Sequence, residues 1–280
     1  MIHDDRGKEG AVSIITISRG SYSRGKEVAE KLAQRLGYEC VSRDVLIEAS
    51  DEFNIPEIKL VRAIHDSPSV LDRFTHGKEK YVAYIRAAVL KRVQKDNVVY
   101  HGLAGHFFLQ DVPHVMKVRI IADFEDRVKE EMKRENISAE KARYTLKKDD
   151  DERRKWGLSL YGADTADNRL YDMVLHIKTL NIEDAVDILF QTVNRPSFRT
   201  TPESRKALEN LSLAAQVQAA LVAGFPSARV TSKNGKVFVS NIETSLLMER
   251  EVVVEVTKMA RKVPGVEEVT VSTTHTITSD

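Results

Sequence analysis

Short apolar runs alternate with amphipathic stretches along the first two thirds of the chain. Residues 11–18, AVSIITIS, form a β-branched run typical of a buried strand in a parallel sheet. The segment that follows places Val28, Leu32 and Leu36 at helical spacing, and Gly37 can end that helix. The alternation indicates βαβ units and an α/β fold, a parallel sheet flanked by helices. After this first strand and helix, the sequence predicts a strand followed by a helix within 38–50, helices at 55–66 and 79–95, and strands at 98–105 and 115–123. A helix at 124–138, a strand at 171–180 and a helix at 181–193 complete the predicted order.

The pattern changes after residue 193. Residues 194–204, NRPSFRTTPES, contain two prolines and several hydroxyl side chains, as linkers do. Beyond them come a helical stretch, two alternating strands around Asn234-Gly235, a second helix and a last alternating strand. This order predicts a small α+β module of the type α-β-β-α-β. We expect a tail at 1–10, the α/β domain at 11–195, a linker at 196–204 and the module at 205–280.

Composition narrows the class of protein. The 43 Lys and Arg residues nearly balance the 42 Asp and Glu residues, and this balance argues against a nucleic acid partner. The single cysteine, Cys40, favours a reducing compartment, and at a strand start it is more typical of a buried thiol than of a nucleophile. The N-terminus lacks the features of a signal peptide, and no apolar run is long enough to span a bilayer. We therefore expect a cytoplasmic protein without a transmembrane segment.

A glycine-rich loop lies between the first predicted strand and the first predicted helix. It has the spacing Gly20-x-x-x-x-Gly25-Lys26. In a phosphate-binding loop, glycines let backbone N–H groups point inward, and the following helix adds its partial positive charge. A lysine at the helix start reaches the β and γ phosphates. The sequence therefore predicts a nucleotide-binding loop, with a purely structural turn as the alternative.

One part of this motif is missing. Glu27 stands where a phosphate-binding loop normally carries the Ser or Thr that binds Mg²⁺. A carboxylate at this point would repel phosphate while attracting the metal. Ser21 or Ser23 can substitute only from within the loop. The sequence therefore leaves the metal ligands unidentified.

Three segments of the chain resemble bacterial cytidylate-kinase-like proteins, which are P-loop nucleoside monophosphate kinases. The resemblance is carried by residues 17–47 with the glycine loop, 98–134 with a strand, a glycine loop and a second strand followed by arginine, and 160–189 with a Tyr-Asp strand. It covers about residues 11–192. It implies phosphoryl transfer from ATP to a nucleoside monophosphate that is CMP-like, with a pyrimidine base, and it implies Mg²⁺ as a second cofactor.

The resemblance also implies roles for individual residues. Asp44 would lie near the acceptor or the metal, and Arg153 and Arg154 would be lid cations over the transferring group. The charge-dense stretch 138–154 that leads to them is equally consistent with a solvated helix. Lys26 would act in catalysis as well as in binding. The donor phosphates would be held by Arg19, Gly20, Ser21, Ser23, Arg24, Gly25, Lys26 and Glu27.

The sequence departs from the family at acceptor-binding positions. The family has an arginine after its third strand, where this chain reads Gly102-Leu103-Ala104. Leucine cannot pair with a phosphate, and the nearby His101 and His106 carry charge only in acid. His176 stands near the family's late-strand Asp or Asn. These departures keep open a second interpretation, a nucleotide-binding regulator with impaired catalysis.

Other candidate sites have simpler explanations. His101 and His106 can suggest a metal site, but no carboxylate or cysteine cluster completes it. Trp156 is expected to anchor a lid more than to stack on a base. The acidic run at 149–151 can hold Mg²⁺, although alternating charge is commoner on a solvated helix.

The C-terminal module resembles a BON domain. The matching features are the Asn-Gly-Lys-Val turn at 234–237, the helix after it, and Pro264-Gly265-Val266 before the last strand. That family is associated with membranes or small ligands, so the resemblance implies a docking role toward a ligand, a membrane surface or a protein partner. A purely structural or membrane-docking protein is the third interpretation, and homo-oligomerisation stays open.

Overall fold

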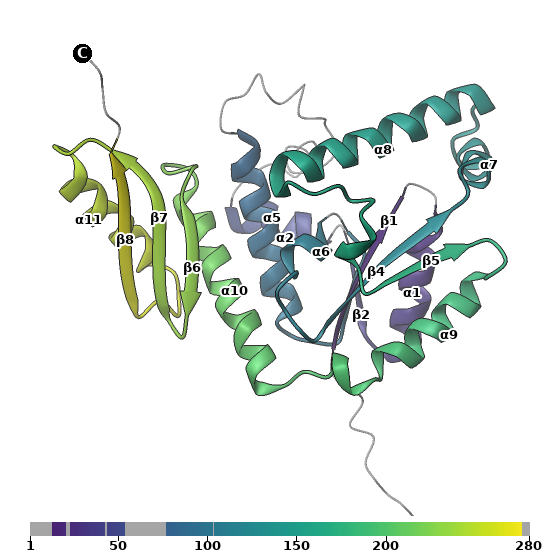
Figure 1. Cartoon of the computed structure of the whole chain (residues 1–280), viewed down its shortest axis with the longest axis horizontal. Helices are drawn as coiled ribbons and strands as arrows, with labels where there is room; N and C mark the ends of the chain where they lie inside the picture. Colours follow the sequence, from purple (N-terminus) through teal and green to yellow (C-terminus); the bar gives the residue numbers. More distant parts are fainter. Residues whose placement is uncertain (1–12, 21–22, 43, 54–76, 103, 276–280) are drawn as a thin grey trace, which may run out of the picture. The chain divides into compact units, whose positions relative to one another are not determined.

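The computed structural model of the chain describes residues 13–20, 23–42, 44–53, 77–102 and 104–275 (Figure 1). Contacts between Cα atoms divide it into two compact units, each assembled from three segments. The first comprises Met1–Ser42, Lys95–Asp150 and Ala166–Ser204, and the second comprises Arg43–Gln94, Asp151–Thr165 and Arg205–Asp280. The helix predicted at 55–66 lies outside the described residues.

The first unit is built on a parallel sheet of five strands. The strands are β1 (Ile14–Arg19), β2 (Glu39–Val41), β3 (Val98–Tyr100), β4 (Val115–Ala122) and β5 (Met173–Ile177). Their order is β2-β3-β1-β4-β5, and every pair in the sheet is parallel. The first strand of the chain therefore occupies the centre. This arrangement confirms the predicted α/β fold.

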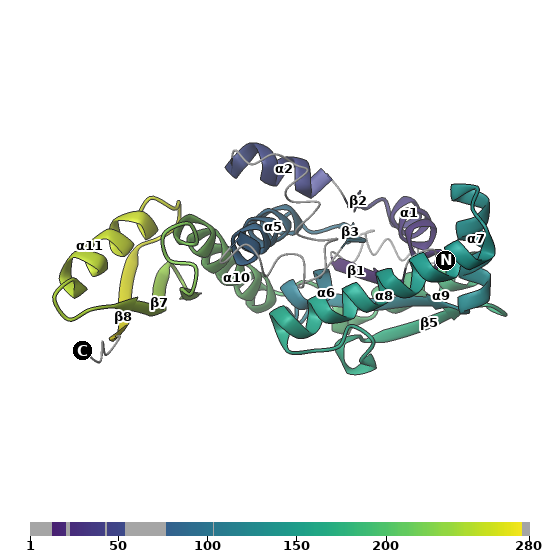
Figure 2. The ribbon, with the colours of Figure 1, turned by 90° about the horizontal axis from the view of Figure 1, so that it is seen from above.

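Helices α1 (Gly25–Leu36) and α9 (Ile182–Val193) cover one face of this sheet. They lie beside each other (Figures 1 and 2). Ile15 and Ile17 of β1 pack beneath them with the apolar stripes of both helices, and all are almost completely buried. Gly37 ends α1 in the left-handed conformation, with φ 69°, as a C-terminal glycine does. Cys40 lies half-buried in β2 against the same core, as a packed thiol.

Three further helices belong wholly or partly to the first unit. They are α6 (Gly105–Phe108), α7 (Phe124–Glu135) and the first part of α8 (Ala139–Tyr161). Val128 of α7 packs against Ala142 and Leu146 of α8 in a small apolar cluster. The charge-dense stretch 138–154 therefore belongs to a helix that packs against α7 through a small number of buried apolar side chains. Short 3₁₀ helices, η1 (Asn168–Leu170) and η2 (Pro196–Phe198), precede β5 and follow α9.

The second unit contains two helices from the first half of the chain. Helices α2 (Asp44–Phe53) and α5 (Gly77–Val93) pack together, and the rings of Phe53 and Tyr84 stack with centroids 4.2 Å apart. Residues 83–90 of α5 are buried apart from Arg86. This helix is therefore buried over most of its surface, where the sequence predicted one apolar stripe.

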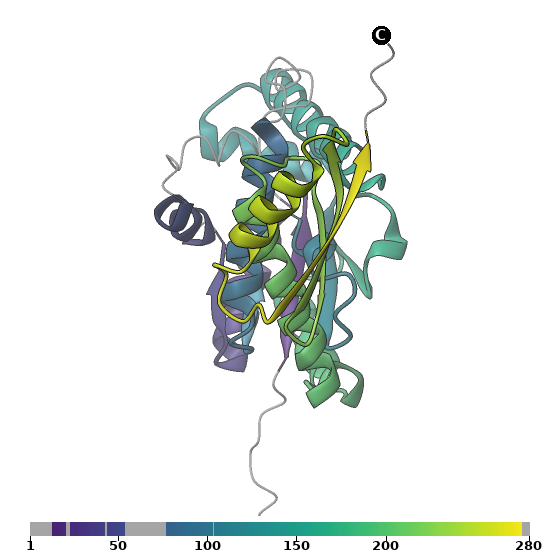
Figure 3. The same ribbon diagram turned by 90° about the vertical axis from the view of Figure 1, so that its left-hand side faces the viewer.

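The C-terminal part of the second unit has the predicted order α-β-β-α-β. Its elements are α10 (Pro202–Leu221), β6 (Arg229–Lys233), β7 (Lys236–Thr244), α11 (Glu249–Ala260) and β8 (Glu268–His275). The sheet order is β6-β7-β8, with β6 antiparallel and β8 parallel to β7. Figure 3 shows α11 lying across one face of this sheet. Both helices bury their apolar side chains against that face.

Two local signals explain the hairpin of this module and the start of its first helix. Asn234 and Gly235 both have positive φ, 51° and 78°, as a tight hairpin turn with matching twist requires. Helix α10 begins at Pro202, inside the segment predicted as a linker. Proline suits a first helical position, and Thr201 and Ser204 cap the helix by exchanging hydrogen bonds between backbone N–H groups and hydroxyls.

Candidate functional site

The glycine-rich loop leaves the carboxyl end of the central strand β1 and runs directly into α1. In open parallel sheets, ligands bind at this edge, where helix N-termini point toward them. Arg19, Gly20, Ser23 and Arg24 of the loop are described. Ser21, which was predicted to contact phosphate, lies outside the described residues. The position of the loop is the one that the sequence predicted for a phosphate cradle.

Close packing explains both glycines of the loop. A Cβ atom on Gly25 would lie 2.7 Å from the Cβ of Arg19, so any larger residue would force the loop to shift. A Cβ atom on Gly20 would lie 3.3 Å from the guanidinium carbon of Arg127. Arg24 adopts the left-handed conformation, with φ 64°, and forms the N-cap of α1. The loop is therefore a tight, specifically shaped turn.

Ser23 closes this turn. Its side chain is 1% exposed, and its hydroxyl donates a 3.0 Å hydrogen bond to the carbonyl oxygen of Gly20. The backbone N–H of Ser23 approaches the same oxygen at 3.4 Å. In this structure the hydroxyl of Ser23 therefore shapes the loop. From the sequence alone, this hydroxyl was also a candidate ligand for the metal.

Lys26 and Glu27 lie on the outer surface of α1. The Nζ atom of Lys26 is 3.6 Å from Glu30, one turn further along the helix, and the lysine side chain is 60% exposed. Glu27 pairs in the same way with Lys31 at 3.7 Å, and Lys31 also pairs with Glu183 of α9. Lys26 is therefore not turned into the loop, and Glu27 faces a lysine.

Arg127 of α7 is the cation that the structure places against the loop. Its side chain is 10% exposed, and its guanidinium donates two hydrogen bonds to the Asp150 carboxylate, at 2.8 and 2.9 Å. Such bidentate pairing fixes the plane of the guanidinium. Arg24 forms a second link to the same helix through Glu130, at 3.0 Å. Sequence reasoning assigned Arg127 no role, although it follows the strand in a segment that resembles the family.

A polar cluster lies near the carboxyl end of β1, close in sequence to the start of the loop. The Tyr171 hydroxyl donates to Ser18 of β1 at 3.2 Å and lies 3.4 Å from the Nε2 atom of His106. Burial, and secondly the charge of Arg119, lowers the pKa of His106 from 6.5 to about 3. His106 is therefore neutral at physiological pH and cannot replace a cationic arginine.

The segment that lacks the family arginine is only partly described. Leu103 lies outside the described residues. Gly102 and Gly105 pack against the Tyr100 ring, since a Cβ atom on Gly102 would lie 2.2 Å from the tyrosine hydroxyl. Ala104 between them has φ 61°, a left-handed conformation that favours glycine, and α6 begins directly after it.

His176 lies on β5, and its Nε2 atom is 2.9 Å from the Asp123 carboxylate. Lys178 reaches the same carboxylate at 2.6 Å. The hydrogen bond from Lys178 is the main cause that lowers the pKa of Asp123. The end of the late strand therefore places an imidazole and a lysine beside one carboxylate at the surface, where the family has a single Asp or Asn.

The remaining predicted residues belong to the second unit, so the first unit alone does not contain them. Asp44 is the first residue of α2, and its side chain is outside the described set. On α8, Arg153 is half-buried and Arg154 is exposed. Trp156 is 3% exposed with its ring centroid 5.6 Å from that of Tyr161, which fits the predicted hydrophobic anchor.

The metal-site hypotheses gain no support. Asp151 pairs with Lys155 at 2.6 Å, one turn further along α8, as on a solvated helix. Asp150 is instead engaged by the nearly buried Arg127 of α7. Over the described parts of the chain, no three His, Cys, Asp or Glu side chains gather as metal ligands would.

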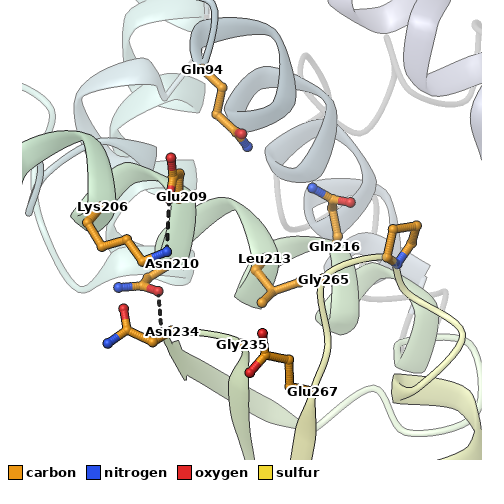
Figure 4. A pocket seen from close by; sticks show the side chains of 11 residues that line it. Gln94, Lys206, Glu209, Asn210, Leu213, Gln216, Asn234, Gly235, Gly265 and Glu267 are labelled. Carbon is orange, nitrogen blue, oxygen red and sulfur yellow. Dashed lines mark hydrogen bonds and ion pairs between the residues drawn. The ribbon is translucent and has the colours of Figure 1, made fainter. Parts of the chain in front are cut away.

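The second unit has a cavity of about 550 Å³ between α10, the β6–β7 hairpin and the loop before β8 (Figure 4). Asn210 accepts a hydrogen bond from the backbone N–H of Asn234 at 2.8 Å, and Lys206 pairs with Glu209 at 3.1 Å. Carboxamides and carboxylates dominate the lining. These groups define a polar groove on the predicted docking module.

A parallel sheet with a glycine-rich loop leading from its central strand into a helix is the architecture of P-loop kinases. A model of the cytidylate kinase-like family matches residues 14–179, and the chain belongs to that family. Membership supports nucleotide-dependent phosphoryl transfer as the general class of chemistry. No protein with a curated description matches the chain.

The chain is also similar to solved structures. An uncharacterized protein from Eubacterium ventriosum is 22% identical, with a TM-score of 0.51 over 65% of this chain and 98% of its own. A shikimate kinase from Bacteroides thetaiotaomicron is 10% identical, with a TM-score of 0.43 over 66% of this chain and 100% of its own.

Among the described residues, no helix combines the length and the apolar character needed to cross a membrane.

Proposed function

We propose that the protein transfers a phosphoryl group from ATP to a nucleoside monophosphate of the CMP type. The observation that carries the proposal is the loop itself: a tight glycine turn at the carboxyl end of the central strand, leading into α1. Backbone N–H groups and the helix dipole at this point favour phosphate oxygens. Membership of the cytidylate kinase-like family supports the same chemistry.

Arg127 strengthens the donor site. Phosphoryl transfer depends on fixed positive charge, because negative charge spreads over the phosphoryl oxygens in the transition state. The Arg127 guanidinium lies 3.3 Å from where a Cβ atom on Gly20 would be, and Asp150 fixes it there while offsetting part of its charge, so it is oriented beside the loop without reorganisation. We assign it to the donor phosphates together with Gly20, Gly25 and the flanking Arg19 and Arg24.

Lys26 has to turn from Glu30 toward the phosphates. An exposed ion pair of this kind contributes less than about 1 kcal/mol, so the rotation costs little. Asp44, Arg153 and Arg154 keep the acceptor and lid roles that the resemblance implies. Mg²⁺ fits as a partner of the ATP phosphates and water more than of a protein cage, since Ser23 is engaged by Gly20.

ADP release, measured with ATP, Mg²⁺ and a panel of nucleoside monophosphates, tests this function. We expect turnover with a pyrimidine acceptor and at least a tenfold loss of ATP affinity in Lys26→Ala. Lys206→Ala, which removes another exposed lysine paired with a nearby glutamate, is the matched control. Folded protein that releases no ADP with any acceptor would exclude the kinase function.

A second candidate is a nucleotide-binding regulator with impaired catalysis. It is favoured by the outward-facing Lys26 and by Leu103 at the position of the acceptor arginine. In this case the C-terminal module, with its BON-like sequence, would dock to a ligand, a membrane surface or a partner. Calorimetry would then show ATP binding without phosphoryl transfer. Unchanged ATP affinity in Lys26→Ala would exclude both candidates.

A further inference from the structure

A patch of exposed apolar side chains lies at the start of α11, in the C-terminal module. Leu246 and Leu247 are 73% and 94% exposed, and Met248 beside them is 48% exposed, in the turn that leads into the helix. Val254, near the middle of α11, is 60% exposed. Soluble domains seldom leave several neighbouring apolar residues this exposed unless the surface contacts a partner. The start and the middle of α11 are therefore candidates for an interface.

Helix α11 has a buried face and an exposed face. Val256 and Ala260 are completely buried in the core of the module. The opposite side, which we call the outer face of α11, consists of exposed residues at alternating spacings of four and three: Leu247, Glu251, Val254, Lys258 and Arg261. Such spacing places residues on one side of a helix. Among the described elements of the module, none lies over this side (Figure 3).

The charges of the outer face are divided along the helix. Glu251 belongs to its N-terminal half, and Lys258 and Arg261 belong to its C-terminal end. Within the described structure, these three side chains form no ion pair. Lys258 and Arg261 also line a shallow hollow of about 450 Å³, together with Val253 and Val254. The outer face therefore presents an acid toward one end, bases toward the other and an apolar side chain between them.

We infer that the outer face of α11 is the interface of a homodimer, in which α11 of a second copy packs against it antiparallel. A two-fold axis at Val254 places Glu251 of each copy opposite Lys258 of the other. It also places Leu247 against the methylene groups of Arg261. Parallel packing would instead oppose Glu251 with Glu251 and Lys258 with Lys258, and like charges at an interface are unfavourable. The inference is independent of the proposed kinase function.

Charge favours a second copy of the chain over a lipid surface. Residues 249–251, next to the apolar turn, are two glutamates and one arginine, so anionic headgroups would meet a net negative charge. In the dimer, the arginine is accommodated. Arg250 and Glu251 lie on opposite flanks of the outer face, because successive helix residues are about 100° apart. The two-fold axis at Val254 therefore brings Arg250 toward the uncharged Thr257 of the other copy.

Charge reversal tests the antiparallel arrangement. One helix per copy buries less than the roughly 1,200 Å² of a stable interface, so sedimentation of the full chain should show a dimer that dissociates on dilution. Glu251→Lys alone, or Lys258→Glu alone, opposes like charges in the homodimer, and we expect each to raise its dissociation constant at least tenfold. An equimolar mixture of the two variants should dimerise again, because each chain then meets opposite charges in the other. Both substitutions in one chain should also restore the dimer.

Lys233→Glu is the matched control, because it reverses an exposed charge on β6, outside the outer face, and should dimerise as the wild type does. Leu247→Asn should weaken the dimer without changing thermal unfolding, since this side chain is almost fully exposed. A wild type that stays monomeric at every concentration reached, or a mixture of the charge variants that dimerises no better than either alone, would overturn the interface. Binding of monomeric wild type to vesicles of phosphatidylcholine and phosphatidylserine, lost in Leu247→Asn, would assign the turn to a membrane and overturn it as well.

Discussion

His106 makes the stability of the protein depend on pH in a calculable way. Its pKa falls from 6.5 in an unfolded chain to about 3 in the fold, because the imidazole is buried beside Arg119. Between these values the unfolded chain binds one proton that the folded chain excludes. Stability is therefore retained above pH 6.5 and is lost as the pH falls toward 3. Each pH unit corresponds to about 1.4 kcal/mol, so the full loss is about 5 kcal/mol and the loss at pH 5 is about 2 kcal/mol.

Urea unfolding from pH 7 to pH 4 measures this dependence. Carboxylates titrate in the same range, so the quantity to compare is the difference in unfolding free energy between wild type and His106→Phe at each pH. This variant removes the imidazole that takes up the proton and keeps an aromatic ring. This variant should be less stable at pH 7, because it removes the contact between His106 and the Tyr171 hydroxyl, yet it should lose less stability on acidification. His176→Gln, at an exposed imidazole, measures the general effect of losing a histidine. If the difference between wild type and His106→Phe stays constant from pH 7 to pH 4, the buried neutral imidazole is refuted.

Four further substitutions test other parts of the structure. Gly25→Ala should destabilise the fold by about 1–3 kcal/mol and weaken ATP binding, because its methyl group meets Arg19; thermal unfolding with and without ATP separates the two effects. Ala104→Gly should raise stability by about 1 kcal/mol in urea, since φ 61° suits glycine; a loss would contradict that backbone angle. Asn181→Ala should cost about 1 kcal/mol, because it removes the capping box with Asp184, and an unchanged melting temperature would count against the cap. Asp150→Asn should weaken ATP binding by leaving Arg127 unfixed, and unchanged affinity would remove Arg127 from the donor site.

Local signals in the sequence predicted most of the fold. The spacing of Val28, Leu32 and Leu36 placed α1, and Asn181 placed the start of α9 through a cap that the structure contains. Asn234-Gly235 placed the hairpin because few other residue pairs accept two positive φ angles. The glycine spacing located the loop at the end of the central strand. Each of these features depends on residues within a few positions of one another.

Contacts between distant segments could not be predicted in this way. Tyr171 meets Ser18 across 153 positions and His106 across 65, and no periodicity connects them. Asp150 looked like one more acid in a solvated helix, yet it holds Arg127. The outward turn of Lys26 was also missed, because its partner Glu30 looks like an ordinary surface residue. The candidate site was therefore located from the sequence, while its charge arrangement required the three-dimensional structure.

Each unit is made of three separate segments of the chain, and this affects how the protein folds during its synthesis at the ribosome. The first unit needs residues up to Ser204 and the second needs residues up to the C-terminus, so neither can finish while the nascent chain is still short. Residues 43–94 are made early and have to wait for the last segment of their unit. A protease cut between Ser204 and Arg205 would leave the last segment of the second unit joined to its early segments by non-covalent contacts alone, so damage at this point would concern more than the C-terminal module.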